Sequence, residues 1–117
     1  MINAEKMQMD LGLDYGKILK DLRLPEVVYE RILRMAVAST EQSILTLQGA
    51  ITSGDMLVIQ KIAHELKGVW ANLRVTSLQT FASEIDDAAR EDKDIEKIKS
   101  LHDQFLEKFD MMKKMCS

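Results

Sequence analysis

Residues 63–74 read Ala-His-Glu-Leu-Lys-Gly-Val-Trp-Ala-Asn-Leu-Arg, and they lie inside a run of apolar residues with helical spacing. The spacings alternate between three and four, which places the apolar side chains along one side of an α-helix. These residues are Ile59, Ile62, Leu66, Val69 and Leu73. His64 lies two residues from both Ile62 and Leu66, roughly 200° around the helix axis from each. We therefore expect its imidazole to face away from the core.

Lys67 and Gly68 follow His64 by three and four residues, so they share its exposed face. A glycine inside a helix costs about 1 kcal/mol relative to alanine, and Gly68 is too far from Leu73 to end this helix. The absence of a side chain at this position would let a partner approach His64 closely. Lys67 would supply positive charge beside an anionic group on the imidazole.

Helical patterns also precede this segment. Pro25 suits the first turn of a helix, where its missing N–H costs nothing. The helix that follows carries a seam of apolar or small residues at alternating spacings of four and three. These residues are Leu33, Val37, Thr40, Ile44, Leu47 and Ile51. Gly54 then favours a helix end, and Asp55 is suited to cap the next helix.

Two further helices are predicted after residue 74. Residues 76–79, Thr-Ser-Leu-Gln, match a capping box and would begin the first of them. Its seam consists of Leu78, Phe81, Ile85 and Ala88. The charged residues 90–94 predict a turn, with Asp92 or Asp94 capping the last helix. The seam of that helix consists of Ile95, Ile98, Leu101, Phe105, Phe109 and Met112.

The predicted fold class is all-α. Four long helices with short connections favour an antiparallel up-down-up-down four-helix bundle. A short additional N-terminal helix is expected over residues 13–22, before Pro25. The chain of 117 residues has the size of one domain, and we assign residues 1–117 to it. Met1 leads us to expect a free-standing protein.

Composition excludes several classes of partner. The net charge is −3, from 16 basic and 19 acidic residues that are mixed along the chain, so a nucleic-acid interface is not expected. No apolar run approaches the roughly 20 residues that a membrane helix needs. The N-terminus resembles no signal peptide, and Cys116 is the only cysteine, which fits a cytoplasmic protein. We expect a monomer.

The chemistry suggested by His64 is phosphoryl transfer. An imidazole with a pKa near 6.5 offers a neutral nucleophilic nitrogen at physiological pH, and the N–P bond that it forms is labile. The sequence lacks a Gly-rich nucleotide loop and a carboxylate cluster for magnesium. We therefore expect a carrier that is not an enzyme and binds no cofactor. Two histidines and one cysteine provide no metal-ligand pair at helical spacing.

Residues 64–68, His-Glu-Leu-Lys-Gly, followed by Asn72-Leu73, resemble the motif of the histidine phosphotransfer (HPt) family, His-x-Leu-Lys-Gly and then Asn/Ser-Leu-Gly. The resemblance implies that His64 is the phosphoacceptor, that Lys67 stabilises phosphoryl charge and that Gly68 gives clearance to a response-regulator receiver domain. A histidine kinase or hybrid kinase would be the other partner. Many family members carry Glu or Gln at the position of Asp86, which implies a contact between Asp86 and the imidazole.

Four residues are predicted to bind the partner, namely Gln60, Lys61, Ala71 and Asp86. Two departures from the family pattern concern partner choice. Arg74 stands where the family usually has glycine, and Trp70 replaces a residue that is usually small, so that it could alter helix packing or shape the docking rim.

Other readings remain open. Glu84, Asp86 and Asp87 form an acidic group that is most often a solvated helix face. His102 has no Lys-Gly pattern beside it, which favours a structural or surface role. The main alternative function is a helical module that docks receiver or kinase domains without being phosphorylated. A bundle that dimerises through Met and Leu side chains is a further alternative.

Overall fold

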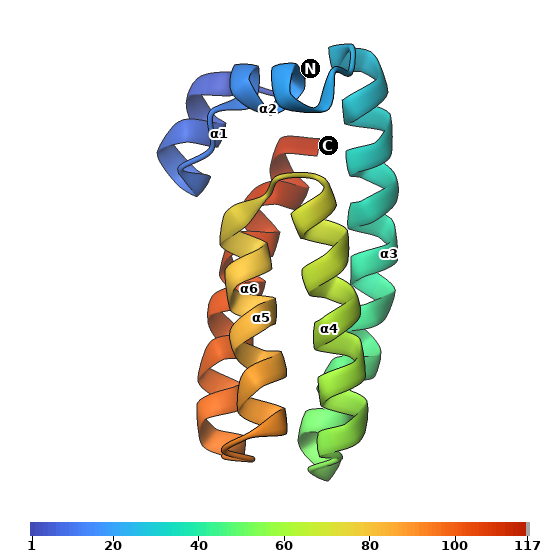
Figure 1. Ribbon diagram of the computed structural model, residues 1–117, viewed down its shortest axis with the longest axis vertical. Coiled ribbons are helices and arrows are strands. Elements are labelled where there is room, and N and C mark those ends of the chain that lie inside the picture. Colours follow the sequence, from blue (N-terminus) through green and yellow to red (C-terminus); the bar gives the residue numbers. More distant parts are fainter. Residues whose placement is uncertain (117) are drawn as a thin grey trace.

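A computed structural model describes residues 1–116, and this part of the chain forms six helices and no strand, which confirms the predicted all-α class. Figure 1 shows four long helices side by side, with two short N-terminal helices across one end. The described residues extend over 41 × 22 × 21 Å. The helices are α1 (Ala4–Leu11), α2 (Tyr15–Leu22), α3 (Glu26–Ser53), α4 (Met56–Asn72), α5 (Thr76–Arg90) and α6 (Ile95–Cys116).

The predicted caps explain most of the helix boundaries. Gly54 ends α3 with a φ of 73°, and the side chain of Asp55 accepts a hydrogen bond from the backbone of α4 at 3.2 Å. The Asp94 carboxylate caps α6 by accepting hydrogen bonds from the backbone N–H groups of Glu96 and Lys97, at 3.1 and 3.3 Å. Asp94 is therefore the cap, and Asp92 is not.

The predicted capping box at residues 76–79 is wrong. The N-cap of α5 is Val75, which makes no side-chain cap bond, and Thr76 is already the first helical residue. Burial decides the start of this helix, because the Val75 side chain is fully buried while its carbonyl accepts from Gln79 N–H at 3.1 Å. The predicted turn also begins too early, since Arg90 is the last residue of α5.

The apolar seams pack together as the core. All six predicted seam residues of α3 are buried, and so are Leu78, Ile85 and Ala88 of α5. Val69 and Phe81 are only partly buried at its edge. Within α6, the rings of Phe105 and Phe109 stack with centroids 6.3 Å apart.

Trp70 belongs to this core and not to a docking rim. Its side chain is fully buried, and its ring meets Phe109 edge-on at 6.4 Å. The buried face of α4 runs through Ala63, Leu66 and Trp70, so the α4 seam turns toward Trp70 where the sequence pattern predicted Val69. The suggestion that Trp70 shapes the docking rim is therefore wrong.

The N-terminal region forms two short helices where one was predicted. Helix α1 was missed, although Asn3 caps it and Gly12 ends it with a φ of 65°. Only Met7 and Leu11 of α1 are buried, too few for a periodic pattern. The backbone N–H of Ile2 donates to the buried Glu30 carboxylate at 2.7 Å, which ties this end of the chain to α3.

The turn between α4 and α5 is tied to α3 by a hydrogen bond. Tyr29 donates its hydroxyl proton to the Leu73 carbonyl at 2.7 Å, so α3 holds the turn between α4 and α5. In that turn Arg74 adopts a φ of 63°, a left-handed conformation that glycine would adopt more easily.

None of the helices within residues 1–116 is long and apolar enough to cross a membrane.

Candidate functional site

His64 lies midway along α4 on the side that faces away from the core. Its neighbours Ala63 and Leu66 are buried, whereas 64% of the His64 side chain is exposed, so the helix period presents the imidazole to solvent as predicted. The ring is not loose, because its Nδ1 atom lies 3.2 Å from Oδ2 of Asp86 on α5. The imidazole–Asp86 contact implied by the family resemblance is thus present.

Asp86 is a fully buried carboxylate with three cationic or basic neighbours. Besides the imidazole, Lys67 Nζ lies 3.5 Å from Oδ2 and Arg90 Nη2 lies 2.9 Å from Oδ1. Charge-assisted contacts of this kind offset the cost of burying a carboxylate. Lys67 and Arg90 carry two positive charges against the single negative charge of Asp86. The site therefore has a net positive charge around the exposed imidazole.

Asp86 therefore cannot contact a partner directly, and its prediction as a partner-binding residue is wrong. The expectation of a solvated acidic face at residues 84–87 holds for Glu84 and Asp87, which are exposed, and fails for Asp86. Ile85 and Ala89 beside it are also buried, because α5 packs against both α4 and α6 and so has a wide buried face.

The contact with Asp86 selects the tautomer of His64. A carboxylate accepts hydrogen bonds, so the neutral imidazole carries its proton on Nδ1 and donates it to Asp86. The lone pair is then on Nε2, which has no hydrogen-bond partner within the described residues. This arrangement presents a nucleophilic nitrogen at the surface.

Gly68, one turn beyond His64, has no structural need to be glycine. A Cβ atom built there meets no other atom within 4 Å, and its φ is not positive. Gly49, on the exposed face of α3, shares both properties. The reason for glycine at position 68 therefore lies outside the packing of this chain.

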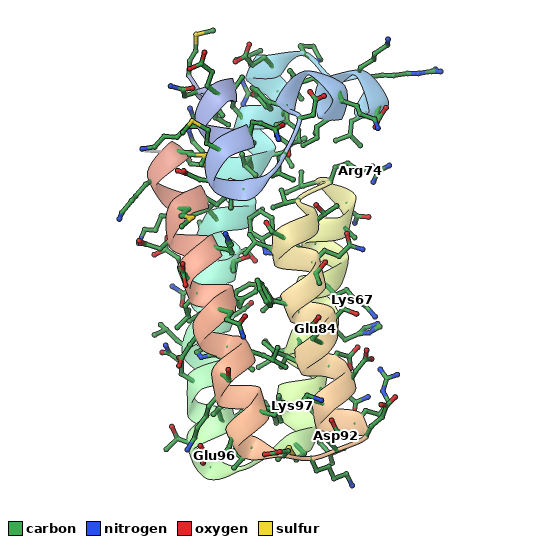
Figure 2. The ribbon with its side chains drawn as sticks, turned by 90° about the vertical axis from the view of Figure 1, so that its left-hand side faces the viewer. Lys67, Arg74, Glu84, Asp92, Glu96 and Lys97 are labelled. Atoms are coloured by element: carbon green, nitrogen blue, oxygen red, sulfur yellow. The ribbon has the colours of Figure 1, made fainter. Side chains whose placement is uncertain are left out.

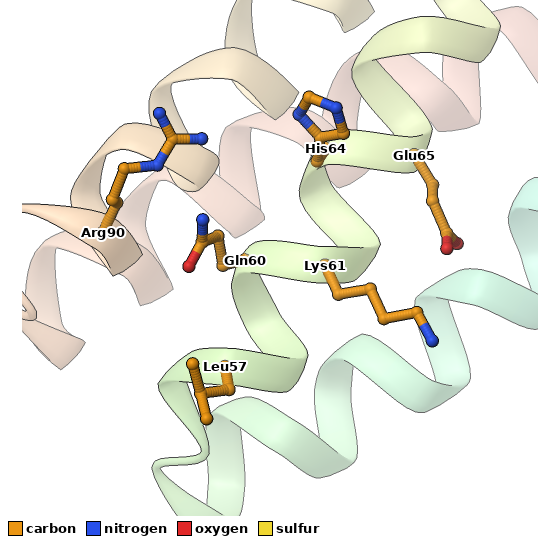
Figure 3. A pocket seen from close by; sticks show the side chains of 6 residues that line it. All are labelled: Leu57, Gln60, Lys61, His64, Glu65 and Arg90. Atoms are coloured by element: carbon orange, nitrogen blue, oxygen red, sulfur yellow. The ribbon is translucent and has the colours of Figure 1, made fainter.

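A shallow depression of about 400 Å³ adjoins the imidazole. Figure 3 shows that the Arg90 side chain extends from α5 toward the exposed ring, while Lys61 and Glu65 turn toward α3. The lining residues are Leu57, Gln60, Lys61, His64, Glu65 and Arg90. Two of the predicted partner-binding residues, Gln60 and Lys61, thus lie beside His64.

The fourth predicted partner-binding residue, Ala71, lies one turn beyond Gly68 and is partly buried. Its carbonyl accepts hydrogen bonds from the backbone N–H and from Nη1 of Arg74, both at 3.1 Å. Figure 2 shows Arg74 at the end of the bundle beside the turn and Lys67 further along the same side. Basic side chains, Lys67 and Arg74, thus lie on the C-terminal side of His64.

Arg90 is the site residue that the sequence interpretation missed. It was assigned to a turn because it opens the charged run 90–94. The spacing of four between Asp86 and Arg90 was visible and favours an ion pair on a helix. That spacing became informative only once α5 was known to continue to Arg90.

His102, the second histidine, has a different environment. It is buried on α6, its Nε2 has no partner within the described residues, and burial lowers its pKa. No group of three His, Cys, Asp or Glu side chains in residues 1–116 is placed to hold a metal ion.

Comparison with known proteins gives one family. The family model described as Hpt domain matches residues 31–113, which include every residue of the site. No curated protein and no solved structure matches the chain.

Proposed function

The chain belongs to the Hpt domain family, the phosphorelay carriers of two-component signalling, and we propose that His64 accepts a phosphoryl group here and passes it to or from a receiver aspartate. The observation that carries the proposal is the His64–Asp86 contact, which pairs an exposed imidazole with a fully buried carboxylate. A surface histidine with no chemical role has no need of such a partner.

The contact supports a specific reaction. Nε2 of neutral His64 attacks the phosphorus of an aspartyl phosphate, the N–P bond forms, and the acyl O–P bond breaks to release the aspartate carboxylate. The ring then carries both the Nδ1 proton and the phosphoryl group, and it is positively charged. Asp86 stabilises that charge through the same hydrogen bond, as a buried carboxylate does for other catalytic imidazoles. No proton has to move during the step, and the reverse step uses the same contacts.

Lys67 and Arg90 are proposed to stabilise the phosphoryl group. Lys67 shares Oδ2 of Asp86 with the ring and Arg90 contacts Oδ1, and their side chains are 32% and 50% exposed, so each remains able to reach an anion at the surface. A phosphoryl group brings up to two negative charges and three acceptor oxygens. The excess positive charge around Asp86 is suited to stabilise the negative charge of the phosphoryl group.

The scaffold is consistent with a carrier that relies on its partners for chemistry. We infer an antiparallel up-down-up-down bundle, because residues 54–55, 73–75 and 91–94 connect successive long helices through short turns. Nothing in the site supplies a nucleotide or a metal ion. Receiver domains and histidine kinases, with which the family interacts in general, are therefore the proposed donors and acceptors, with Gln60, Lys61 and Ala71 in the contact surface.

Transfer assays test the proposal. The chain is incubated with phosphorylated receiver domains, and with autophosphorylated histidine kinases, and the label is tested for the acid lability and alkali stability of a phosphoramidate. We expect wild type and His102→Gln to take up label and His64→Gln to take up none. Label that persists in His64→Gln would move the site elsewhere.

The same assay separates the carrier from the alternative function. A module that only docks receiver or kinase domains would bind them while taking no label from any donor. That result would replace the carrier proposal with the binding module, since the two functions share the surface and differ in the N–P bond.

A further inference from the structure

Leu57 is an exposed leucine at the edge of the depression that contains His64. Leu57 is the second residue of α4, and 79% of its surface is exposed, compared with 63% for Leu45 on α3. We propose that Leu57 is the apolar anchor of the receiver interface, covered when a receiver domain docks over His64. This inference depends on the proposed function for the identity of the partner, and it adds a residue that determines affinity.

The position of Leu57 relative to His64 supports the inference. Seven residues separate them, which is two helical turns and places both on one side of α4, roughly 10 Å apart. Figure 3 shows Leu57, Gln60 and His64 in succession along the helix, with Arg90 opposite them on α5. A domain that brings an aspartyl phosphate to Nε2 of His64 spans more than this distance, so it covers Leu57 as well.

The surroundings of Leu57 indicate what kind of surface fits there. The other residues that line the depression are polar or charged, and Lys61 and Arg90 are its basic members. Interfaces commonly combine an apolar contact with neighbouring polar groups, as Leu57 and the polar residues on its His64 side do. The matching surface has an apolar side chain with acidic groups around it, and the aspartyl phosphate adds negative charge.

Leu45 provides a matched control. It is also an exposed leucine, but it lines a different depression, between α3 and α6. No residue of that depression contacts His64 or Asp86. A receiver positioned over His64 leaves Leu45 uncovered.

The experiment measures binding and transfer separately. A receiver domain that exchanges label with wild type is titrated, without phosphate, against wild type, Leu57→Ala and Leu45→Ala, and single-turnover transfer is followed over a range of receiver concentrations. Because docking would bury the Leu57 side chain, its removal in Leu57→Ala is expected to raise the Kd for the receiver about tenfold. The transfer rate at saturating receiver is expected to stay within about twofold of wild type. Leu45→Ala is expected to match wild type in both, and circular dichroism checks that all three are folded.

Two results would overturn the inference. One is a Kd for Leu57→Ala that equals that of wild type while transfer proceeds, which leaves the carrier function intact and removes the anchor. The other is an equal loss of affinity in Leu45→Ala. A wild type that binds receivers through Leu57 but takes no phosphoryl group would instead contradict the proposed function and leave the interface standing.

Discussion

At the scale of single residues, Asp86 determines the state of the site. Its carboxylate has no exposed surface, yet it contacts an imidazole, an ammonium and a guanidinium that all reach solvent. The negative charge fixes the His64 ring, and Lys67 and Arg90 compensate that charge in the interior. Helical spacing placed His64, Lys67 and Gly68 on one face, and the family resemblance implied the contact with Asp86, but neither predicted that Asp86 is buried.

Replacing Asp86 by asparagine tests this dependence. Asp86→Asn keeps the size of the side chain but removes the charge that stabilises the phosphorylated ring. A hydrogen bond to a charged group contributes about 1.5–3 kcal/mol, so we expect the single-turnover rate of transfer to fall about 10–100-fold. Asp87→Asn alters an exposed neighbour and is the matched control. Equal rates for Asp86→Asn and wild type would remove Asp86 from the mechanism.

Gly68 allows a second test at this scale. Because a Cβ atom meets nothing there, Gly68→Ala is expected to stabilise the fold by up to about 1 kcal/mol, and Gly49→Ala by a similar amount. Because both positions are exposed, we expect the fold to tolerate a leucine at either of them as well. Gly68→Leu, however, is expected to slow transfer from a receiver at least about tenfold through lost contact with the partner. Urea unfolding and single-turnover transfer measure the two effects, and equal transfer by Gly68→Leu and Gly49→Leu would remove the clearance argument.

At the scale of helices, apolar periodicity predicted the four long helices, but burial against neighbouring helices changed some of their boundaries and buried faces. Each seam of α3, α5 and α6 followed from the spacing of apolar residues, and Asp55 and Asp94 followed from cap preferences. The errors have physical causes. Val75 is drawn into the core and moves the start of α5, α4 turns Trp70 inward, and α1 buries too few residues to be periodic. Such choices depend on the neighbouring helices, which a single segment does not contain.

The burial of Trp70 gives a prediction for α4. Trp70→Ala removes the largest fully buried side chain from the contact with Phe109, so we expect a loss of about 3–5 kcal/mol in the free energy of unfolding. Urea denaturation measures it. If Trp70 were part of the docking surface instead, Trp70→Ala would keep its stability and lose affinity for the receiver.

At the scale of the whole molecule, the fold places its two histidines in opposite environments, one exposed and one buried. His64 is held at the surface by α5, whereas α6 carries His102 into a site where burial disfavours its protonated form and lowers its pKa, a trend that neighbouring Asp103 only partly offsets. The fold therefore exposes one imidazole and buries the other. Helical spacing predicted that His64 is exposed, but the burial of His102 depends on the helices packed around α6, which its own segment does not contain.

The buried histidine predicts how stability changes with pH. The unfolded chain binds a proton at His102 near its ordinary pKa of about 6.5, and the folded chain binds it only at lower pH. The free energy of unfolding therefore loses nothing to His102 protonation above about pH 6.5, and it decreases as the pH falls below that value. We expect His102→Leu to lose less stability than wild type between pH 7.5 and 5.5 in thermal unfolding. Parallel curves for the two proteins would contradict a buried neutral His102.

The central claim is that His64 carries the phosphoryl group on Nε2 while Nδ1 holds its proton against Asp86. The most direct measurement is a nitrogen–proton correlation spectrum of the ¹⁵N-labelled imidazoles, recorded before and after transfer from a phosphorylated receiver domain. We expect Nε2 of His64 to become bonded to phosphorus, Nδ1 of the same ring to remain protonated, and His102 to be unchanged. Phosphorus on Nδ1 of His64, or on His102, would contradict the account.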